Sequence, residues 1–321
     1  MLDIEKELKE VKSIGVAGHV RPDGDCVGSA TAIYGYIRKL FPEKRVDLYL
    51  EDFSTSFRFL DGAKEAKRVI KPEISYEAFI VVDCADEARI GVAHDAFRQA
   101  EKKIVIDHHV SNNGYGDISF VDGNASSTCE MVYQLIAPER LDEQIAESLY
   151  LGMIHDTGIF QYSNTSKATL EAAAVLVSKG IDTARIIDET FYQKTYEQNL
   201  LLGRTLLASQ LMLDGKCILS AVSQEEMKSF GVTPKDFEGV VNQLRITKGV
   251  EIAILMYEIE PGTYKVSLRS NKGADVNKIA AAFGGGGHVK AAGCYIAGPQ
   301  WEAIARLVQE VEKGLEEFFG D

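Results

Sequence analysis

Three side chains that can bind a metal ion follow a short apolar segment near the start of the chain. His19, Asp23 and Asp25 lie within the segment GHVRPDGDCVGS, with the spacing H-x-x-x-D-x-D. Pro22 and Gly24 are typical of turns, and a turn can direct all three side chains toward one point. The same spacing also fits a solvated turn in which Asp25 caps the following helix. On its own, the segment leaves both interpretations open.

Further candidate ligands follow two predicted strands and a predicted helix. Asp83 ends the apolar segment AFIVVD, and His108 and His109 follow KIVID in a chain with only six histidines. Asp156 lies at the end of a helical stretch and supplies another carboxylate. Taken alone, Asp83 is better explained as the first residue of a loop, and the histidine pair also fits a surface position. Asp107 fits either an acceptor that orients an imidazole or a residue that ends a strand.

Considered together, these residues predict a metal centre. They offer imidazole and carboxylate groups without thiolates, a combination that suits Mn²⁺ or Mg²⁺. So many acids in one place need cations to offset their mutual repulsion. Two divalent cations would do this, and a hydroxide that bridges them can attack phosphorus. We therefore expect a two-metal phosphoesterase with Mn²⁺ as the preferred ion.

The predicted secondary structure explains how these residues can meet. Short apolar segments predict strands at 13–18, 45–50, 78–83, 103–107 and, more weakly, 118–122. Helices are expected over 27–40, 143–155, 167–179, 183–191 and 195–212. Strands that alternate with helices are typical of an α/β fold with a parallel sheet, whose sites form beyond the carboxyl ends of the strands. The sequence thus places the candidate ligands at one edge of one sheet.

The second half of the chain has a different pattern. Strands are predicted in CILSAVS, EIAILMYEIE, YKVSLRS and CYIAG, and a helix in DVNKIAAAF. We expect a smaller α+β domain here and place the boundary near residue 190. Residues 1–190 would then hold the metal site, and residues 191–321 would form a helical linker and the second domain.

Two features of this second domain suit phosphate. Arg269 lies near the end of YKVSLRS, and a guanidinium can bind phosphate through two parallel hydrogen bonds. A glycine run then precedes a histidine: Gly284, Gly285, Gly286, Gly287 and His288. Such a bare loop lets backbone N–H groups approach an anion closely. A flexible connector is the alternative explanation of the glycines.

Composition narrows the range of partners. The net charge of −13 argues against binding of long duplex nucleic acid, which normally needs a basic surface. Apolar runs are too short for a membrane span, and the segment MLDIEKELKEVK does not resemble a secretory signal. Five dispersed cysteines without a CxxC motif favour buried thiols in a reducing cytoplasm. The expected partner is a short RNA or a small phosphorylated nucleotide in the cytoplasm.

Together, the motifs resemble the DHH phosphoesterase superfamily with a C-terminal DHHA1 domain. The resemblance covers residues 13–298 and rests on GHVRPDGDCVGS, VVDCAD, VIDHH, HDTGIF, SLRS and GGGGHVKAAG. It implies two cation sites that share Asp83. The first consists of His19, Asp23 and Asp83, and the second of Asp25, His108, Asp156 and Asp83.

The resemblance also implies roles for the remaining motifs. His109 would contact the scissile phosphate or assist proton transfer. Arg269 and the loop from Gly284 to His288 would bind the nucleotide. The active site would then lie in the cleft between the two domains, where domain motion can control access.

An activity is implied as well. In length and domain layout the chain is similar to the bacterial nano-RNase and pAp phosphatase subgroup, which trims very short oligoribonucleotides and removes the 3′ phosphate of 3′-phosphoadenosine 5′-phosphate (pAp). Close relatives of that subgroup act on cyclic di-AMP or linear pApA, so a dinucleotide phosphodiesterase is the first alternative. A non-catalytic nucleotide sensor is a remote alternative that the intact ligand set disfavours. A homodimer is expected from the family alone.

Overall fold

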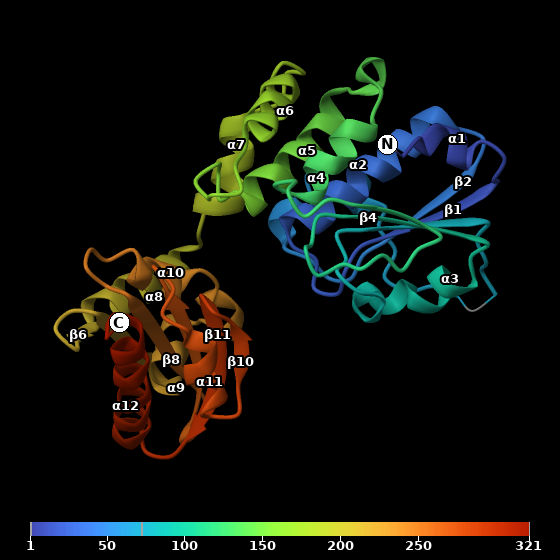
Figure 1. The fold of residues 1–321 in the computed structure, drawn as a ribbon. Coiled ribbons are helices and arrows are strands. Elements are labelled where there is room, and N and C mark those ends of the chain that lie inside the picture. The colour runs from blue at the N-terminus through green and yellow to red at the C-terminus, as the bar shows by residue number, and fades with distance from the viewer. Residues whose placement is uncertain (1, 72, 321) are drawn as a thin grey trace. The chain divides into compact units, whose positions relative to one another are not determined.

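The chain forms two compact units. The computed structural model describes residues 2–71 and 73–320. Contacts within the chain divide it into Met1–Gln193 and Lys194–Asp321, called unit 1 and unit 2 below (Figure 1). Among the described helices, none combines the length and apolar composition needed to cross a membrane. All five cysteines are buried and free, as their dispersed spacing predicted.

Unit 1 is built around a parallel sheet of five strands. The strands are β1 Ser13–Ala17, β2 Arg45–Tyr49, β3 Ala78–Val82, β4 Lys102–Asp107 and β5 Ile118–Val121. They lie in the order β2-β1-β3-β4-β5, and every neighbouring pair is parallel, which confirms the predicted arrangement. The direction of strand addition reverses between β1 and β3. In open α/β sheets, this reversal point is where sites form beyond the carboxyl ends of the strands.

Helices cover both faces of this sheet. They are α1 Ile4–Leu8, α2 Gly24–Leu40, α3 His94–Gln99, α4 Thr128–Leu135, α5 Glu143–Asp156, α6 Lys167–Val177 and α7 Thr183–Ile187. The larger core packs α2, α4 and α5 against one face, and a smaller aromatic core forms on the face that α3 covers (Figure 1). Gly15 in β1 faces the ring of Phe79 in the smaller core. A Cβ at Gly15 would lie 2.3 Å from that ring, so only glycine fits.

Two predicted helices of unit 1 need correction. The helix expected over 27–40 begins at Gly24, because the Asp23 side chain accepts a hydrogen bond from the Cys26 N–H and caps it. The helix expected over 183–191 consists of α7 and a following π-helical turn, Asp188–Tyr192.

Unit 2 contains a mixed sheet of six strands in the order β10-β11-β9-β8-β7-β6. The strands are β6 Gln210–Met212, β7 Cys217–Val222, β8 Ile252–Glu260, β9 Thr263–Ser270, β10 Gly286–His288 and β11 Ala291–Ala297. β7 and β8 are parallel, and the other neighbouring pairs are antiparallel. β8 and β9 form a hairpin whose turn contains Pro261 and Gly262.

Two helical layers enclose this second sheet. The helices are α8 Tyr196–Leu207, α9 Gln224–Phe230, α10 Val240–Arg245, α11 Val276–Ala281 and α12 Gln300–Phe319. One core packs the sheet against α11 and α12, and the other packs it against α8, α9 and α10. The helix predicted over 195–212 therefore ends at Leu207, because residues 210–212 pair with β7 as the edge strand β6.

Candidate metal centre

The turn between β1 and α2 positions the first three candidate ligands. His19 follows β1 and is 5% exposed. Asp23 is the N-cap of α2, and Asp25 lies in the first turn of this helix, fully buried. The helix cap is thus Asp23 and not Asp25. Gly24 lets this turn pack closely, because a Cβ there would lie 2.2 Å from the His155 ring.

Asp83 lies directly beyond β3 in a strained conformation. Its φ is +53°, in the left-handed region that non-glycine residues rarely adopt, and its side chain is 3% exposed. Its N–H donates to the Ile106 carbonyl on β4 at 3.0 Å. Strain of this kind costs about 1–3 kcal/mol and is typical of functional sites. The conformation directs the Asp83 carboxylate toward the histidines from two other segments.

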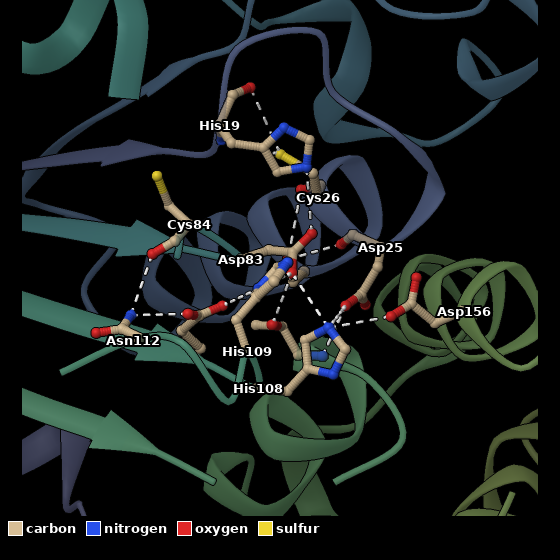
Figure 2. A network of polar contacts seen from close by, with 12 residues as sticks. His19, Asp25, Cys26, Asp83, Cys84, His108, His109, Asn112 and Asp156 are labelled. Atoms are coloured by element: carbon tan, nitrogen blue, oxygen red, sulfur yellow. Dashed lines mark hydrogen bonds and ion pairs between the residues drawn. The ribbon is translucent and has the colours of Figure 1, made fainter. Parts of the chain in front are cut away.

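Four of the other candidate metal ligands lie around Asp83, namely His19, Asp25, His108 and Asp156 (Figure 2), and Asp23 joins them through His19. On one side, His19 Nε2 lies 3.5 Å from Asp83 Oδ2 and 3.7 Å from Asp23 Oδ1. On the other side, His108 Nε2 lies 3.7 Å from Asp83 Oδ1. The same nitrogen lies 3.1 Å from Asp156 Oδ2 and 3.9 Å from Asp25 Oδ2. The two Asp83 oxygens therefore face two separate groups of donors.

The pKa shifts in this cluster indicate uncompensated negative charge. Burial, reinforced by the negative charges of Asp83 and Asp156, raises the pKa of Asp25. Burial also raises the pKa of Asp156. Burial opposes protonation of His108, but its hydrogen bond to Asp156 and the charge of Asp25 prevail and raise its pKa to about 10. The cluster has more buried negative charge than the protein neutralises, and bound cations would neutralise it.

Cys26 is a seventh donor within reach of His19 and Asp83. Burial raises the pKa of its thiol to about 12. Its sulfur accepts the His19 N–H at 3.2 Å. Metal ligation by cysteine requires the thiolate. As a protonated thiol, Cys26 binds the backbone of the His19 turn, and the other six donors are nitrogen and oxygen atoms.

The first turn of α4, which was not predicted from the sequence, holds two of the carboxylates. The N–H groups of Thr128 and Cys129 donate to Asp25 Oδ2 and Oδ1 at 2.6 and 2.9 Å. The Thr128 hydroxyl donates to Asp83 Oδ1 at 3.0 Å. A helix N-terminus attracts carboxylates in this way. The available signal was the segment SSTCE, where Ser127 before an apolar stretch indicates a helix start.

Asp107 joins the centre from the last position of β4. Its Oδ1 lies 2.7 Å from His109 Nδ1, and its Oδ2 accepts a 2.7 Å hydrogen bond from Asn112. Asn112 also donates to the Cys84 carbonyl (Figure 2). The hydrogen bond to Asp107 raises the pKa of His109. This geometry fits an acceptor that orients the His109 ring and leaves Nε2 for another partner.

The two unassigned histidines lie outside the cluster. His155 packs against Phe57 and Phe191, with ring centroids 5.0 and 4.4 Å away, and burial lowers its pKa to about 4. His94 begins α3, and its Nε2 lies 3.0 Å from Glu87.

The candidate phosphate-binding residues all belong to unit 2. Arg269 on β9 pairs with Ala291 on β11, and its guanidinium donates only to the Leu268 carbonyl among the described residues. The glycine run is not wholly the bare loop that we predicted. Gly286, Gly287 and His288 form β10, because they pair with β11, and the Gly287 N–H donates to Asn277 at 2.8 Å. Gly284 and Gly285 remain in the turn, and His288 is exposed.

Comparison with known proteins agrees with the fold and identifies the family. Residues 13–153 match the DHH family, N-terminal domain, and residues 214–317 match the DHHA1 domain. The chain belongs to the DHH/DHHA1 family of phosphoesterases.

Particular relatives extend over nearly the whole chain. The bifunctional oligoribonuclease and PAP phosphatase NrnA of Mycoplasma pneumoniae is 30% identical, over 92% of this chain and 91% of that protein. The NrnA protein of Bacillus subtilis is 27% identical, over 92% of each chain. The crystal structure of an exopolyphosphatase-related protein from Bacteroides fragilis superimposes with a TM-score of 0.86 and 27% identity, over 96% of this chain and 94% of the other.

Proposed function

We propose that this phosphoesterase hydrolyses short oligoribonucleotides and the 3′ phosphate of pAp, with the help of two divalent cations, preferably Mn²⁺. The observation that carries the proposal is the convergence of six nitrogen and oxygen donors on the two sides of Asp83. The substrates are supported by the likeness to the two NrnA relatives, each named a bifunctional oligoribonuclease and PAP phosphatase.

The donor set fits a pair of cations. His19, Asp23 and Asp83 would hold one ion. Asp25, His108 and Asp156 would hold the other, and Asp83 would be shared. Imidazole and carboxylate ligands without thiolate suit Mn²⁺. When bound, the pair supplies a water of lowered pKa and positive charge that stabilises the reacting phosphate.

The remaining residues orient the substrate and move protons. Asp107 engages His109 Nδ1, so Nε2 is the atom that would donate a proton to the leaving oxygen or contact the scissile phosphate. Arg269 would bind a substrate phosphate, because no carboxylate among the described residues pairs with it. The exposed strand β10 and the preceding Gly284 and Gly285 would offer backbone N–H groups to the same nucleotide. A cleft between the domains remains a prediction, as in the sequence analysis.

The compartment follows from the cysteines. Five buried and free cysteines favour a reducing environment, so we place the enzyme in the cytoplasm.

A substrate panel tests the proposal directly. The purified protein would be treated with EDTA, supplied with Mn²⁺ or Mg²⁺, and assayed with pAp, RNAs of two to five nucleotides, pApA, cyclic di-AMP and pyrophosphate. We expect no turnover in EDTA, and the highest kcat/KM with Mn²⁺ on pAp and the shortest RNAs. A preference for cyclic di-AMP or pApA would replace the proposal by the dinucleotide phosphodiesterase. Binding without turnover of any compound would indicate a sensor.

A further inference from the structure

A polar pocket of about 350 Å³ lies at one end of the sheet of unit 2. Four chain segments meet there: the residue before β7, the end of α10 with the turn to β8, the residues after β9, and the end of α12. Backbone hydrogen bonds hold them together. The Glu251 N–H donates to the Lys216 carbonyl at 2.8 Å, and the Asn271 N–H donates to the Glu251 carbonyl at 2.9 Å. The pocket is therefore part of the folded sheet and not a gap between mobile loops.

The charge of this pocket is positive, although the whole chain carries −13. Its cationic lining residues are Lys216, Arg245, Lys248 and Lys272. Within the described part of the chain, none of the four forms an ion pair with a carboxylate. Glu251 is the one acid that lines the pocket, and its carboxylate already accepts N–H groups from Lys272, Gly273 and Ala274 at 3.0–3.1 Å. The pocket therefore has excess positive charge that an anion from solution could neutralise.

Arg245 is the best oriented of these cations. Its guanidinium donates to Asn271 Oδ1 at 2.7 Å, and the Asn271 amide donates to the carbonyls of Arg245 and Val250 at 2.8 and 2.7 Å. Asn271 is thus fixed from both ends and holds the arginine in place, while most of the guanidinium donors stay free. Burial and the positive charge of Arg245 lower the pKa of Arg269. Within the described residues neither guanidinium forms an ion pair with a carboxylate, and two such uncompensated charges favour a bound anion.

We propose that this pocket binds a second phosphate group of the nucleotide substrate, one that is not cleaved, and that Arg245 is its main contact. The proposal rests on the proposed function for the identity of the nucleotide. Three flexible ammonium groups around one fixed guanidinium suit a phosphate with several oxygens. The pocket binds without reacting, because no histidine lines it and its one carboxylate is engaged. Substrates with an additional terminal phosphate would therefore bind more tightly.

The first test measures binding without catalysis. Inorganic tripolyphosphate would be titrated into the full chain by calorimetry in EDTA, so that neither divalent cations nor hydrolysis contribute. We expect saturable binding that Arg245→Gln weakens about tenfold, as does the exposed pair Lys248→Gln/Lys272→Gln. Lys235→Gln, at an exposed lysine that does not line the pocket, is the matched control and should bind as the unaltered protein does. Binding that only Arg269→Ala weakens, or no binding at all, would overturn the proposal.

The second test connects the pocket to the substrate. The ratio of kcat/KM for pApA to kcat/KM for ApA, which lacks the terminal phosphate, should fall about tenfold in Arg245→Gln and stay constant in Lys235→Gln. An equal loss on both dinucleotides would show that Arg245 does not recognise the terminal phosphate and would refute its assignment. If the protein hydrolyses neither compound, the proposed function fails. The tripolyphosphate titration still decides whether the pocket binds phosphate. Unfolding midpoints of all variants show whether each has kept its fold.

Discussion

The metal centre of unit 1 and the cationic end of unit 2 bind charge in opposite ways. The acids of unit 1 are short and mostly buried, and other protein groups fix them. Asp25 is held by two backbone N–H groups and Asp83 by the Thr128 hydroxyl. The pocket lysines of unit 2 are long and exposed, and of the four pocket cations in the described chain only Arg245 donates to a side chain, that of Asn271.

This difference fits the ligands that we propose for the two regions, divalent cations in unit 1 and phosphate groups in unit 2. A pair of cations demands fixed donors, and fixed donors must be oriented before the ion arrives, because a site loosened by 1 Å loses much of its affinity and catalytic power. The phosphates of a nucleotide are larger and more variable in position, and flexible ammonium groups can follow them. In unit 1 the free-energy cost of the site is paid in the folded protein, as backbone strain and desolvation of the acids. In unit 2 the cost arises on binding, when mobile side chains become ordered.

The strongest challenge to the comparison is to remove the shared carboxylate. Asp83→Asn keeps an oxygen that can accept from Thr128 but leaves only one oxygen for the two cations. His108→Ala removes the imidazole on the Oδ1 side of Asp83. We expect each to lower kcat on the order of a thousandfold or more, because Asp83→Asn would disturb both cations and His108→Ala would disturb one of them. Steady-state assays with Mn²⁺ measure this, and circular dichroism and unfolding midpoints confirm the fold. Undiminished turnover in either variant would contradict the metal assignment.

A subtler change tests whether fixed donors matter. Thr128→Val preserves volume but removes the hydroxyl that orients Asp83, whereas Thr128→Ser keeps the hydroxyl. We expect the valine variant to bind Mn²⁺ about 10–100-fold more weakly, and the serine variant to retain most of the affinity. Calorimetric Mn²⁺ titration separates metal binding from catalysis. Unchanged Mn²⁺ affinity in the valine variant would show that the Thr128 hydroxyl does not help to hold the metal ligands.

Much of unit 1 could be predicted because strand periodicity and ligand motifs coincide. Strands that end directly in DHH or in Asp83 define both the sheet and the edge where the site lies. The six ligands were named from these motifs, and the structure brings them together around Asp83. Thr128 was missed because its role depends on tertiary contact, since it lies more than a hundred residues from Asp25 in the sequence.

Unit 2 was harder to predict because its elements depend on partners distant in sequence. The edge strand β6 was assigned to a helix, since its three residues gain strand structure only by pairing with β7. The glycine run was assigned to a bare loop, although β11 draws part of it into β10. Helix α12 was not predicted, although its buried residues Ala303, Leu307, Val311 and Leu315 recur at every fourth position. The pocket around Arg245 combines four segments with no recognisable motif.

Substitutions in unit 2 should weaken substrate binding more than they slow the chemical step. Arg269→Ala removes a phosphate contact that ground state and transition state share, so we expect KM to rise about tenfold and kcat to fall less. Lys265→Ala is the matched control, because Lys265 lies four residues earlier on the same side of β9. Its KM should not change. An unchanged KM in Arg269→Ala, measured with pAp, would remove this arginine from the substrate site.

The smallest expected effect concerns an acid of unit 1 that the protein neutralises itself. Burial of Asp47 opposes ionisation, but hydrogen bonds from Lys67, Tyr76 and Arg45 prevail and lower its pKa. A carboxylate whose folded pKa is lowered stabilises the fold above its unfolded pKa of about 3.9 and loses that contribution as the pH falls through the folded pKa. Asp47→Asn should therefore lower the free energy of unfolding by about 1–2 kcal/mol at pH 7, since its cationic partners are half-exposed.

The pH dependence of that difference shows whether charge is responsible. In urea unfolding, the gap between Asp47→Asn and the unaltered protein should narrow below about pH 4, where the unfolded carboxyl becomes protonated, and close as the pH falls through the lower folded pKa. Mn²⁺ affinity should not change, because Asp47 lies on β2 and forms its ion pairs with Arg45 and Lys67, which are not among the metal ligands. A gap that is constant with pH would mean that packing, and not ionisation, accounts for it. A buried acid with its own countercharges would then behave no differently from any polar core residue, and the contrast with the acids of the metal centre would rest on Asp25 and Asp156 alone.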